Sequence, residues 1–245
     1  MSEFTDQVVL VTGAGRGIGR EVAEAFAGSG AILAANDLTP INLDETLAHI
    51  RSAGGRARDY IFDIAKKMPI QAMVSQVLAD WGRIDVLVNS AGVNPQATIL
   101  DMDEWDWHRT MDVNLGGPFW AMQVVGRAMR EQGGGVMVNV ASPAAGAPKL
   151  KDCAATVASK LGLVGLTQEA AQELAPYGIR VNMVCSGLAG TTREWVPADL
   201  KEQGRIGEIP TDISLGRQTS IVEAVVFLCS QAAAQVTGQV IFIES

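Results

Sequence analysis

The 245-residue sequence has few of the residues that build disulfide frameworks, metal centres or membrane spans. Three cysteines, Cys153, Cys185 and Cys229, are an odd number without metal-ligand spacing, which favours reduced thiols in a cytoplasm. The two histidines, His49 and His108, lie far apart on predicted helices, where surface positions are favoured over metal ligation. No apolar run is long enough to span a bilayer, and MSEFTDQ at the start lacks a signal-peptide pattern. We therefore expect a cytoplasmic protein with no metal site and no membrane contact.

Basic charge is scarce as well. The chain has 19 Lys and Arg against 27 Asp and Glu, a formal net charge of −8. Because no basic cluster occurs, we expect no nucleic-acid partner. The hydrophobic content of 48% allows a sizeable core, and the sequence shows no internal repeat, low-complexity segment or linker. We therefore expect residues 1–245 to form a single α/β domain.

What the sequence does contain is a regular alternation of short apolar runs and amphipathic helical segments. This alternation predicts a parallel sheet covered by helices on both faces. The predicted strands are 7–11, 31–36, 57–62, 84–89, 135–140, 179–184 and 238–243. The predicted helices are 17–28, 41–53, 66–81, 102–131, 153–175, 193–205 and 219–231.

The first strand leads into a glycine-rich turn within VVLVTGAGRGIG, residues 8–19. A helical pattern of apolar residues follows the turn. A strand, a glycine turn and a helix in this order direct free backbone N–H groups and a helix N-terminus at an anion. An ordinary strand-to-helix turn is the alternative. The buried strand before the glycines and the helix after them favour a nucleotide site.

The second predicted strand ends at Asp37, about 20 residues beyond the glycine turn, where dinucleotide folds place an acid that binds the adenosine ribose. A carboxylate there repels a 2′-phosphate, so Asp37 favours NAD over NADP. Arg16 in the glycine turn favours NADP more weakly, since a guanidinium could reach that phosphate. The alternative for Asp37 is a turn or N-cap residue before Pro40.

Six motifs together resemble the classical short-chain dehydrogenase/reductase family, in particular members similar to 3-oxoacyl-acyl-carrier-protein reductase and glucose dehydrogenase. They are TGxxxGxG at 12–19, NSAG at 89–92, VN at 113–114, VNVAS at 138–142, SK at 159–160 and GIRVN at 178–182. The resemblance covers essentially the whole chain. It implies a doubly wound Rossmann-type domain whose seven-stranded parallel sheet has the order 3-2-1-4-5-6-7. It also implies dimers or homotetramers built by helices 102–131 and 153–175.

The resemblance further implies an oxidoreductase that transfers hydride between a nicotinamide cofactor and a secondary alcohol or ketone. In such a site Ser142 would bond the substrate oxygen, Asn114 would hold a proton-relaying water, and Lys160 would complete the relay. A buried Asn with a structural role is the alternative for Asn114. The residues implied to bind the cofactor are Gly13, Arg16, Gly17, Ile18, Gly19, Asp37, Asp63, Ile64, Asn89, Ala91, Gly92, Lys160, Gly187 and Thr191.

The chain departs from the family where its catalytic tyrosine is expected. Thr156 stands four residues before Lys160, and the only tyrosines are Tyr60 and Tyr177. A threonine hydroxyl is a weaker acid than a phenol and reaches less far, and losing a positioned general acid costs about 10²–10⁴ in rate. Lys160 itself, Asp152 and Cys153 are further candidates for the missing role.

Two smaller departures accompany this one. Ser186-Gly187 replaces the family's Pro-Gly, and the chain ends in Glu244-Ser245 instead of Gly-Gly. Residues 188–210 are expected to form a mobile flap over the substrate. Three functions therefore remain open: an NAD-dependent oxidoreductase weakened by Thr156, a redox-inactive dinucleotide-binding homologue, and an enzyme of non-redox elimination or isomerisation.

Overall fold

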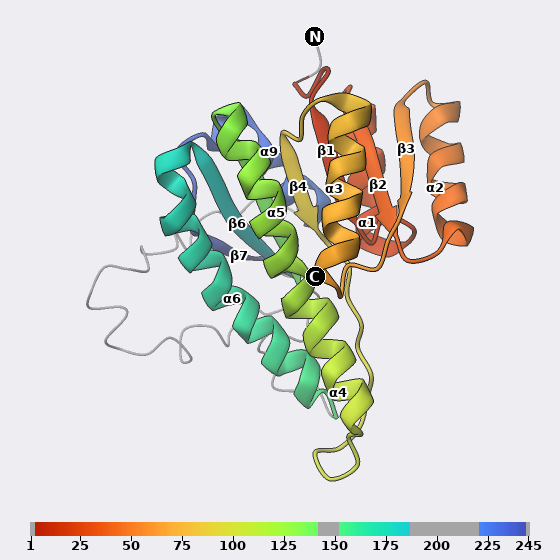
Figure 1. The fold of residues 1–245 in the computed structure, drawn as a ribbon, viewed down its shortest axis with the longest axis vertical. Helices are drawn as coiled ribbons and strands as arrows, with labels where there is room; N and C mark the ends of the chain where they lie inside the picture. The colour runs from red at the N-terminus through yellow and green to blue at the C-terminus, as the bar shows by residue number, and fades with distance from the viewer. Residues whose placement is uncertain (1–2, 142–151, 187–220, 244–245) are drawn as a thin grey trace.

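A seven-stranded parallel sheet forms the centre of the molecule (Figure 1). The computed structural model describes residues 3–141, 152–186 and 221–243. The strand order is β3-β2-β1-β4-β5-β6-β7, and each neighbouring pair is parallel. The strands are β1 (Val8–Thr12), β2 (Ile32–Asp37), β3 (Arg56–Ile61), β4 (Val86–Asn89), β5 (Gly135–Ala141), β6 (Ile179–Ser186) and β7 (Val240–Ile243). The predicted doubly wound class and strand order are confirmed.

Helices cover both faces of this sheet (Figure 1). One face carries α1 (Gly17–Gly28), α2 (Pro40–Ser52) and α9 (Ile221–Cys229). The other carries α3 (Lys67–Trp81), α5 (Gly117–Gln132) and α6 (Ala154–Leu174). The described residues also include the 3₁₀ turns η2 (Ala175–Tyr177) and η3 (Gln231–Ala233). Successive strand residues face opposite sides, so both faces of a central strand must be apolar. The continuous apolar run of β1 meets this requirement, with all five of its residues buried.

The predicted strands all occur, with boundaries within two residues of those expected. Six of the predicted helical regions are also present, and the predicted helix 193–205 lies outside the described residues. The predicted helix 102–131 is present as one continuous helical segment, but it contains a π turn that was not predicted. The chain there forms α4 (Glu104–Met111), the π-helical turn η1 (Asp112–Gly116) and then α5.

Pro118 explains this π turn. Proline lacks an N–H, and its ring clashes with the carbonyl four residues earlier, here that of Asn114. A wider π turn relieves this crowding, and such turns are frequent at functional sites. The signal was therefore present in the sequence, as a proline inside an otherwise helical pattern.

The strand order reverses between β1 and β4, which defines a crevice at their carboxyl ends, where open α/β sheets bind ligands. The hydroxyl of Thr12, at the end of β1, accepts hydrogen bonds from the backbone N–H groups of Ser90 (3.1 Å) and Ala91 (3.3 Å). These bonds join the glycine turn after β1 to the NSAG turn after β4. The fold therefore brings two of the predicted motifs to one place.

Candidate cofactor and active site

The glycine turn has the backbone geometry of an anion site. Gly13 and Gly17 adopt positive φ angles of 69° and 54°. A Cβ on Gly13 would lie 2.7 Å from the Cα of Ala91, so glycine is required where the two turns pack together. A Cβ on Gly17 would meet nothing within 4 Å, which shows that this side of the turn is open.

The N-terminus of α1 is also available to a ligand. Arg16 occupies the N-cap in an extended conformation, its side chain makes no capping hydrogen bond, and no acidic residue lies in the first turn. The first N–H groups of α1 therefore have no side-chain acceptor, and the helix dipole is uncompensated there. A pyrophosphate fits this turn in both space and charge.

Asp37 lies at the end of β2, against the glycine turn. Its Oδ2 accepts a hydrogen bond from the Gly15 N–H (3.0 Å), and its Oδ1 accepts one from the Leu38 N–H (2.7 Å). A Cβ on Gly15 would stand 2.6 Å from that Oδ2, so the glycine makes this approach possible. The N-cap of α2 is Thr39, so Asp37 does not cap that helix. The carboxylate is thus held beside the anion site.

Sequence reasoning missed Arg20, which braces the same turn. Its Nη2 donates to the carbonyls of Gly15 (2.6 Å) and Asn42 (3.2 Å), and its Nε donates to the Thr46 hydroxyl (3.0 Å). An ion pair with Glu45 at 2.8 Å completes the contacts. An arginine on the first turns of a predicted helix gives no sequence signal that separates such a brace from an ordinary surface cation.

The loop after β3 carries Asp63 and Ile64, two of the residues implied to bind the cofactor. Asp63 accepts the Ala65 N–H (3.0 Å) and forms an ion pair with Arg109 of α4 (3.2 Å). Ile64 is buried, and its side chain occupies the space into which a Cβ on Gly117 would project. Arg109 was not among the predicted site residues, because only the tertiary structure brings α4 to this loop.

Asn89 ends β4, and its side chain is directed into the molecule. Its Nδ2 donates to Oδ1 of Asn139 on β5 (2.9 Å), and Asn139 donates to the Thr167 hydroxyl on α6 (2.9 Å). This buried amide chain joins β4, β5 and α6. The Nδ2 of Asn89 is thus engaged inside the molecule, and contacts of Ala91 and Gly92 with a cofactor would come from their backbone.

Asn114 lies in the π turn and is completely buried. Its Oδ1 accepts the Val93 N–H (2.9 Å), and its Nδ2 donates to the Val93 carbonyl (2.9 Å) and to the Ser159 hydroxyl (3.2 Å). The amide thus attaches the loop after β4 to α6, which is a structural role. A proton relay through this residue would have to use its backbone carbonyl.

Lys160 is the central charge of the site. Its side chain is on α6, and the residue is 4% exposed. Nζ donates one long hydrogen bond, to the Val140 carbonyl at 3.5 Å, and forms no ion pair among the described residues. Burial lowers the pKa of Lys160 to about 8, against a smaller opposing effect of the Cys185 thiol. A Cβ on Gly92 would lie 3.6 Å from Nζ, so the ammonium faces the NSAG turn.

Thr156 lies one helical turn before Lys160 and is 2% exposed. Its hydroxyl donates to Oδ1 of Asn94 at 2.7 Å. The loop that carries Asn94 is joined to the start of α6 a second time, by the Ala97 N–H and the Asp152 carbonyl (2.8 Å). Sequence reasoning missed Asn94, which follows the NSAG motif in a loop without a periodic pattern. The Thr156 hydroxyl is therefore already engaged in a hydrogen bond.

Cys153 and Asp152 lie at the start of α6. Cys153 is buried at the N-cap of α6, and Asp152 is exposed with a φ of 60°. Ser142, Gly187, Thr191 and the flap 188–210 lie outside the described residues.

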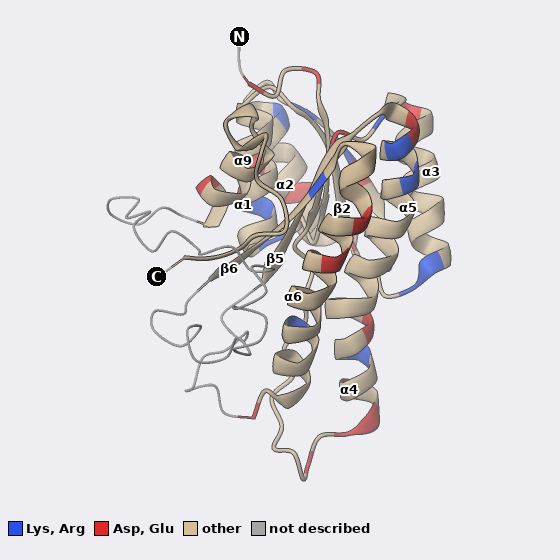
Figure 2. Cartoon of the chain, turned by 90° about the vertical axis from the view of Figure 1, so that its left-hand side faces the viewer, with Lys and Arg blue, Asp and Glu red and all other residues tan. Residues whose placement is uncertain are grey.

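In the described part of the chain, no three His, Cys, Asp or Glu residues could hold a metal ion, and no helix is long and apolar enough to cross a membrane. His49 and His108 are exposed side chains paired with Glu24 and Glu104. Lys and Arg are interspersed with Asp and Glu on the helices (Figure 2).

The crevice, the glycine turn and the acid at the end of β2 define a dinucleotide-binding Rossmann-type protein. Residues 7–199 match the family model of short chain dehydrogenase, and the chain belongs to this family of nicotinamide-dependent oxidoreductase enzymes. It is 38% identical to an uncharacterized oxidoreductase of Thermotoga maritima, over 98% of this chain and 97% of the relative.

Two further relatives agree with this assignment. The 3-oxoacyl-[acyl-carrier-protein] reductase FabG of Thermotoga maritima is 36% identical, over 97% of this chain and 96% of that protein. An NAD⁺-bound xylitol dehydrogenase structure superimposes with a TM-score of 0.81 at 30% identity, covering 99% of this chain and 100% of that one. The predicted family is confirmed.

Proposed function

We propose that this protein is an NAD-dependent dehydrogenase or reductase of secondary alcohols and ketones, with activity weakened at Thr156. Lys160 carries the proposal. A buried ammonium with a single 3.5 Å hydrogen bond and no carboxylate partner among the described residues is unfavourable in a folded chain. Hydroxyl groups of a bound nucleotide would supply the missing acceptors. The NAD⁺-bound xylitol dehydrogenase of similar fold supports the choice of cofactor.

The proposed cofactor site follows the crevice. Gly13, Arg16, Gly17, Ile18 and Gly19 would hold the pyrophosphate, because the N-terminus of α1 has no side-chain cap and the turn is open beside Gly17. Asp37 would bind the adenosine ribose, and Asp63 and Ile64 the adenine. The nicotinamide half would lie against Asn89, Ala91, Gly92, Lys160, Gly187 and Thr191. When bound, the cofactor donates or accepts the hydride.

The proton must be moved by side chains of this chain. Ser142 would orient the substrate oxygen. Lys160, with a pKa of about 8, exchanges a proton near neutral pH, whereas the Thr156 hydroxyl does not ionise there. Thr156 would therefore act as an uncharged link between Lys160, a water and the substrate. This indirect route accounts for a weakened rate.

A redox-inactive homologue that only binds the dinucleotide is the second candidate. The hydrogen bond from Thr156 to Asn94 favours it, because it removes that hydroxyl from the proton route. NADH titration followed by assays on a panel of ketones separates the two. Binding with slow turnover supports the oxidoreductase, binding without turnover supports the second candidate, and absence of binding contradicts both.

The same proposal includes one domain over residues 1–245 and a cytoplasmic location. The reduced state of the three cysteines supports the location. All three are buried, and none takes part in a disulfide.

Cofactor preference gives the first testable prediction. NADH should bind at least about tenfold more tightly than NADPH, because the Asp37 carboxylate, held on Gly15, would face the 2′-phosphate. Asp37→Ala should reduce the difference between the affinities for NADH and NADPH, mainly by weakening NADH binding. Fluorescence titration of the two reduced cofactors measures both effects. Asp59→Ala, in the middle of β3, is the control, and tighter binding of NADPH by the unaltered chain would overturn the assignment.

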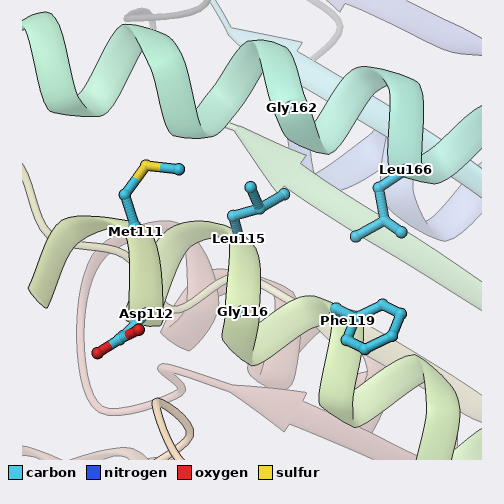
Figure 3. A pocket seen from close by; sticks show the side chains of 7 residues that line it. All are labelled: Met111, Asp112, Leu115, Gly116, Phe119, Gly162 and Leu166. Carbon is cyan, nitrogen blue, oxygen red and sulfur yellow. The ribbon is translucent and has the colours of Figure 1, made fainter. Parts of the chain in front are cut away.

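A homo-oligomer, dimer or tetramer, is proposed on the surface formed by α5 and α6. A cavity of about 460 Å³ lies between α6 and the segment formed by the end of α4, η1 and the start of α5, lined mainly by apolar side chains (Figure 3). Its lining residues are Met111, Asp112, Leu115, Gly116, Phe119, Gly162 and Leu166. Phe119 and Trp105 remain 38% and 70% exposed, and a Cβ on Gly165 would meet nothing within 4 Å. Exposed apolar area beside small residues favours a close helix–helix contact.

Phe119→Glu should therefore reduce the mass of the particle in solution. A carboxylate in the centre of the proposed contact would have to be buried without a partner. Sedimentation equilibrium measures the outcome. Met68→Glu, at a 79% exposed position on α3, is the matched control. An unchanged mass for Phe119→Glu would place the interface elsewhere.

A further inference from the structure

The loop after β3 is held by one continuous helical element at two points. Nη1 of Arg109, on α4, lies 3.2 Å and 3.3 Å from the two carboxylate oxygens of Asp63. Directly after η1, at the start of α5, Gly117 packs on Ile64, where a Cβ would stand 2.9 Å from the Ile64 carbonyl oxygen. The position of this loop therefore depends on α4 and α5 and not only on β3.

The ion pair leaves Asp63 able to bind a further donor. The two side chains are 26% and 25% exposed, so the pair lies at the surface of the crevice and is partly screened. A carboxylate has about four acceptor sites, and the Ala65 N–H and the shared Arg109 N–H groups do not use all of them. A single nitrogen, Nη1, contacts both oxygens, and this restrains rotation of the carboxylate because turning its plane would lengthen one of the two contacts.

We propose that Arg109 is a positioning residue for adenine recognition, acting through Asp63. This inference rests on the proposed function, because it takes the loop 62–65 as the adenine site. Arg109 orients the Asp63 carboxylate so that its unused acceptor sites face the exocyclic amino group of the base. The same helical element continues into η1, where Asn114 holds the loop after β4. The segment formed by α4 and η1 therefore holds both the loop after β3 and the loop after β4.

The test compares two ligands that carry one phosphate each, AMP and reduced nicotinamide mononucleotide. Arg109→Met should weaken AMP and NADH binding about threefold to fivefold, as expected for a partly exposed ion pair. Binding of reduced nicotinamide mononucleotide should not change, because this ligand has no adenine. Arg109→Lys should weaken AMP and NADH binding less than Arg109→Met does, since it keeps the positive charge but carries it on a flexible stem without the rigid guanidinium plane.

A double-mutant cycle shows whether Arg109 acts through Asp63. In an Asp63→Asn background, Arg109→Met should cause no additional loss of AMP affinity. Arg58→Met is the matched control. It removes a different arginine–aspartate ion pair, which joins Arg58 on β3 to Asp80 near the end of α3. It should leave the affinity for all three ligands unchanged.

The outcomes are distinct. Equal loss for AMP and reduced nicotinamide mononucleotide would show a general effect on the fold and overturn the inference. A further loss in the Asp63→Asn background would show direct contact of Arg109 with the nucleotide and also overturn it. Unaltered NADH and AMP binding by Arg109→Met would overturn the inference alone. Failure of the unaltered chain to bind NADH would overturn the proposed function with it.

Discussion

Thr156→Tyr is expected to raise kcat/KM for ketone reduction by about 10² or more, because it restores a general acid worth about 10²–10⁴ in rate. A phenol at this position would lie one helical turn from Lys160, whose ammonium favours the phenolate. NADH affinity should change little, since Thr156 is not proposed to bind the cofactor. Steady-state rates on a ketone panel and NADH titration measure the two quantities.

The side chain of Asn94 limits the space available to a tyrosine at position 156. Thr156 and Asn94 are in direct contact at 2.7 Å, and Thr156 is buried, so a tyrosine ring needs space that the Asn94 side chain borders. The double variant Thr156→Tyr with Asn94→Gly should therefore raise kcat/KM at least as much as the single variant. Thr156→Phe, alone and with Asn94→Gly, adds a ring without a hydroxyl and should not raise kcat/KM.

The result separates the functional candidates. A gain confined to the tyrosine variants would show a substrate pocket that lacks only its acid. No gain from either tyrosine variant, with NADH binding intact, would show that the pocket itself has changed and would favour the redox-inactive candidate. An equal gain from the phenylalanine variants would show a packing effect and contradict the proposed acid.

Lys160→Met is expected to lower ketone reduction by about 10² or more and to weaken NADH binding, because it removes both a proposed ribose ligand and the proposed proton source. In the unaltered chain the reduction rate should be constant below pH 8 and fall above it. The reason is that a general acid must be protonated, and burial lowers the pKa of Lys160 to about 8. A pH–rate profile measures the effect.

The thermal stability of Lys160→Met shows whether a fall in its activity comes from the loss of the proposed proton source or from unfolding of the protein. The folded-state pKa of Lys160 lies below the ordinary lysine value of 10.5, so folding favours the neutral amine. The contribution of this group to stability is present above pH 10.5 and is lost as the pH falls through about 8. At neutral pH the lysine is thus a buried charge, and Lys160→Met should have a Tm equal to or higher than that of the unaltered chain.

Lys66→Met, at an exposed position before α3, is the control and should change neither rate nor profile. A rate that continues unchanged above pH 9, or full activity of Lys160→Met, would exclude Lys160 from the proton route.

Much of the fold could be predicted from the sequence. Parallel strands buried on both faces are continuous apolar runs, and β1 shows this pattern directly. Gly13 could be identified because a positive φ and a close backbone contact both require glycine there. The π turn was missed although Pro118 signals it, since the periodicity of α4 and α5 conceals a single such turn.

The partners of the site residues could not be predicted. Arg109 with Asp63, Asn94 with Thr156 and Arg20 with Gly15 are contacts between side chains or loops that only packing brings together. Local periodicity carries no information on such pairs, because a polar residue on a helix surface or in a loop looks the same whether or not it meets a partner.

The sequence alone thus predicted the doubly wound sheet and the family, because these depend on local pattern and residue identity. Only the tertiary structure decided that the Thr156 hydroxyl is engaged by Asn94, that the Asn114 side chain holds a loop, and that Lys160 is buried with one weak hydrogen bond to the described residues. The physical reason is that hydrogen bonding and desolvation depend on which distant segments pack together.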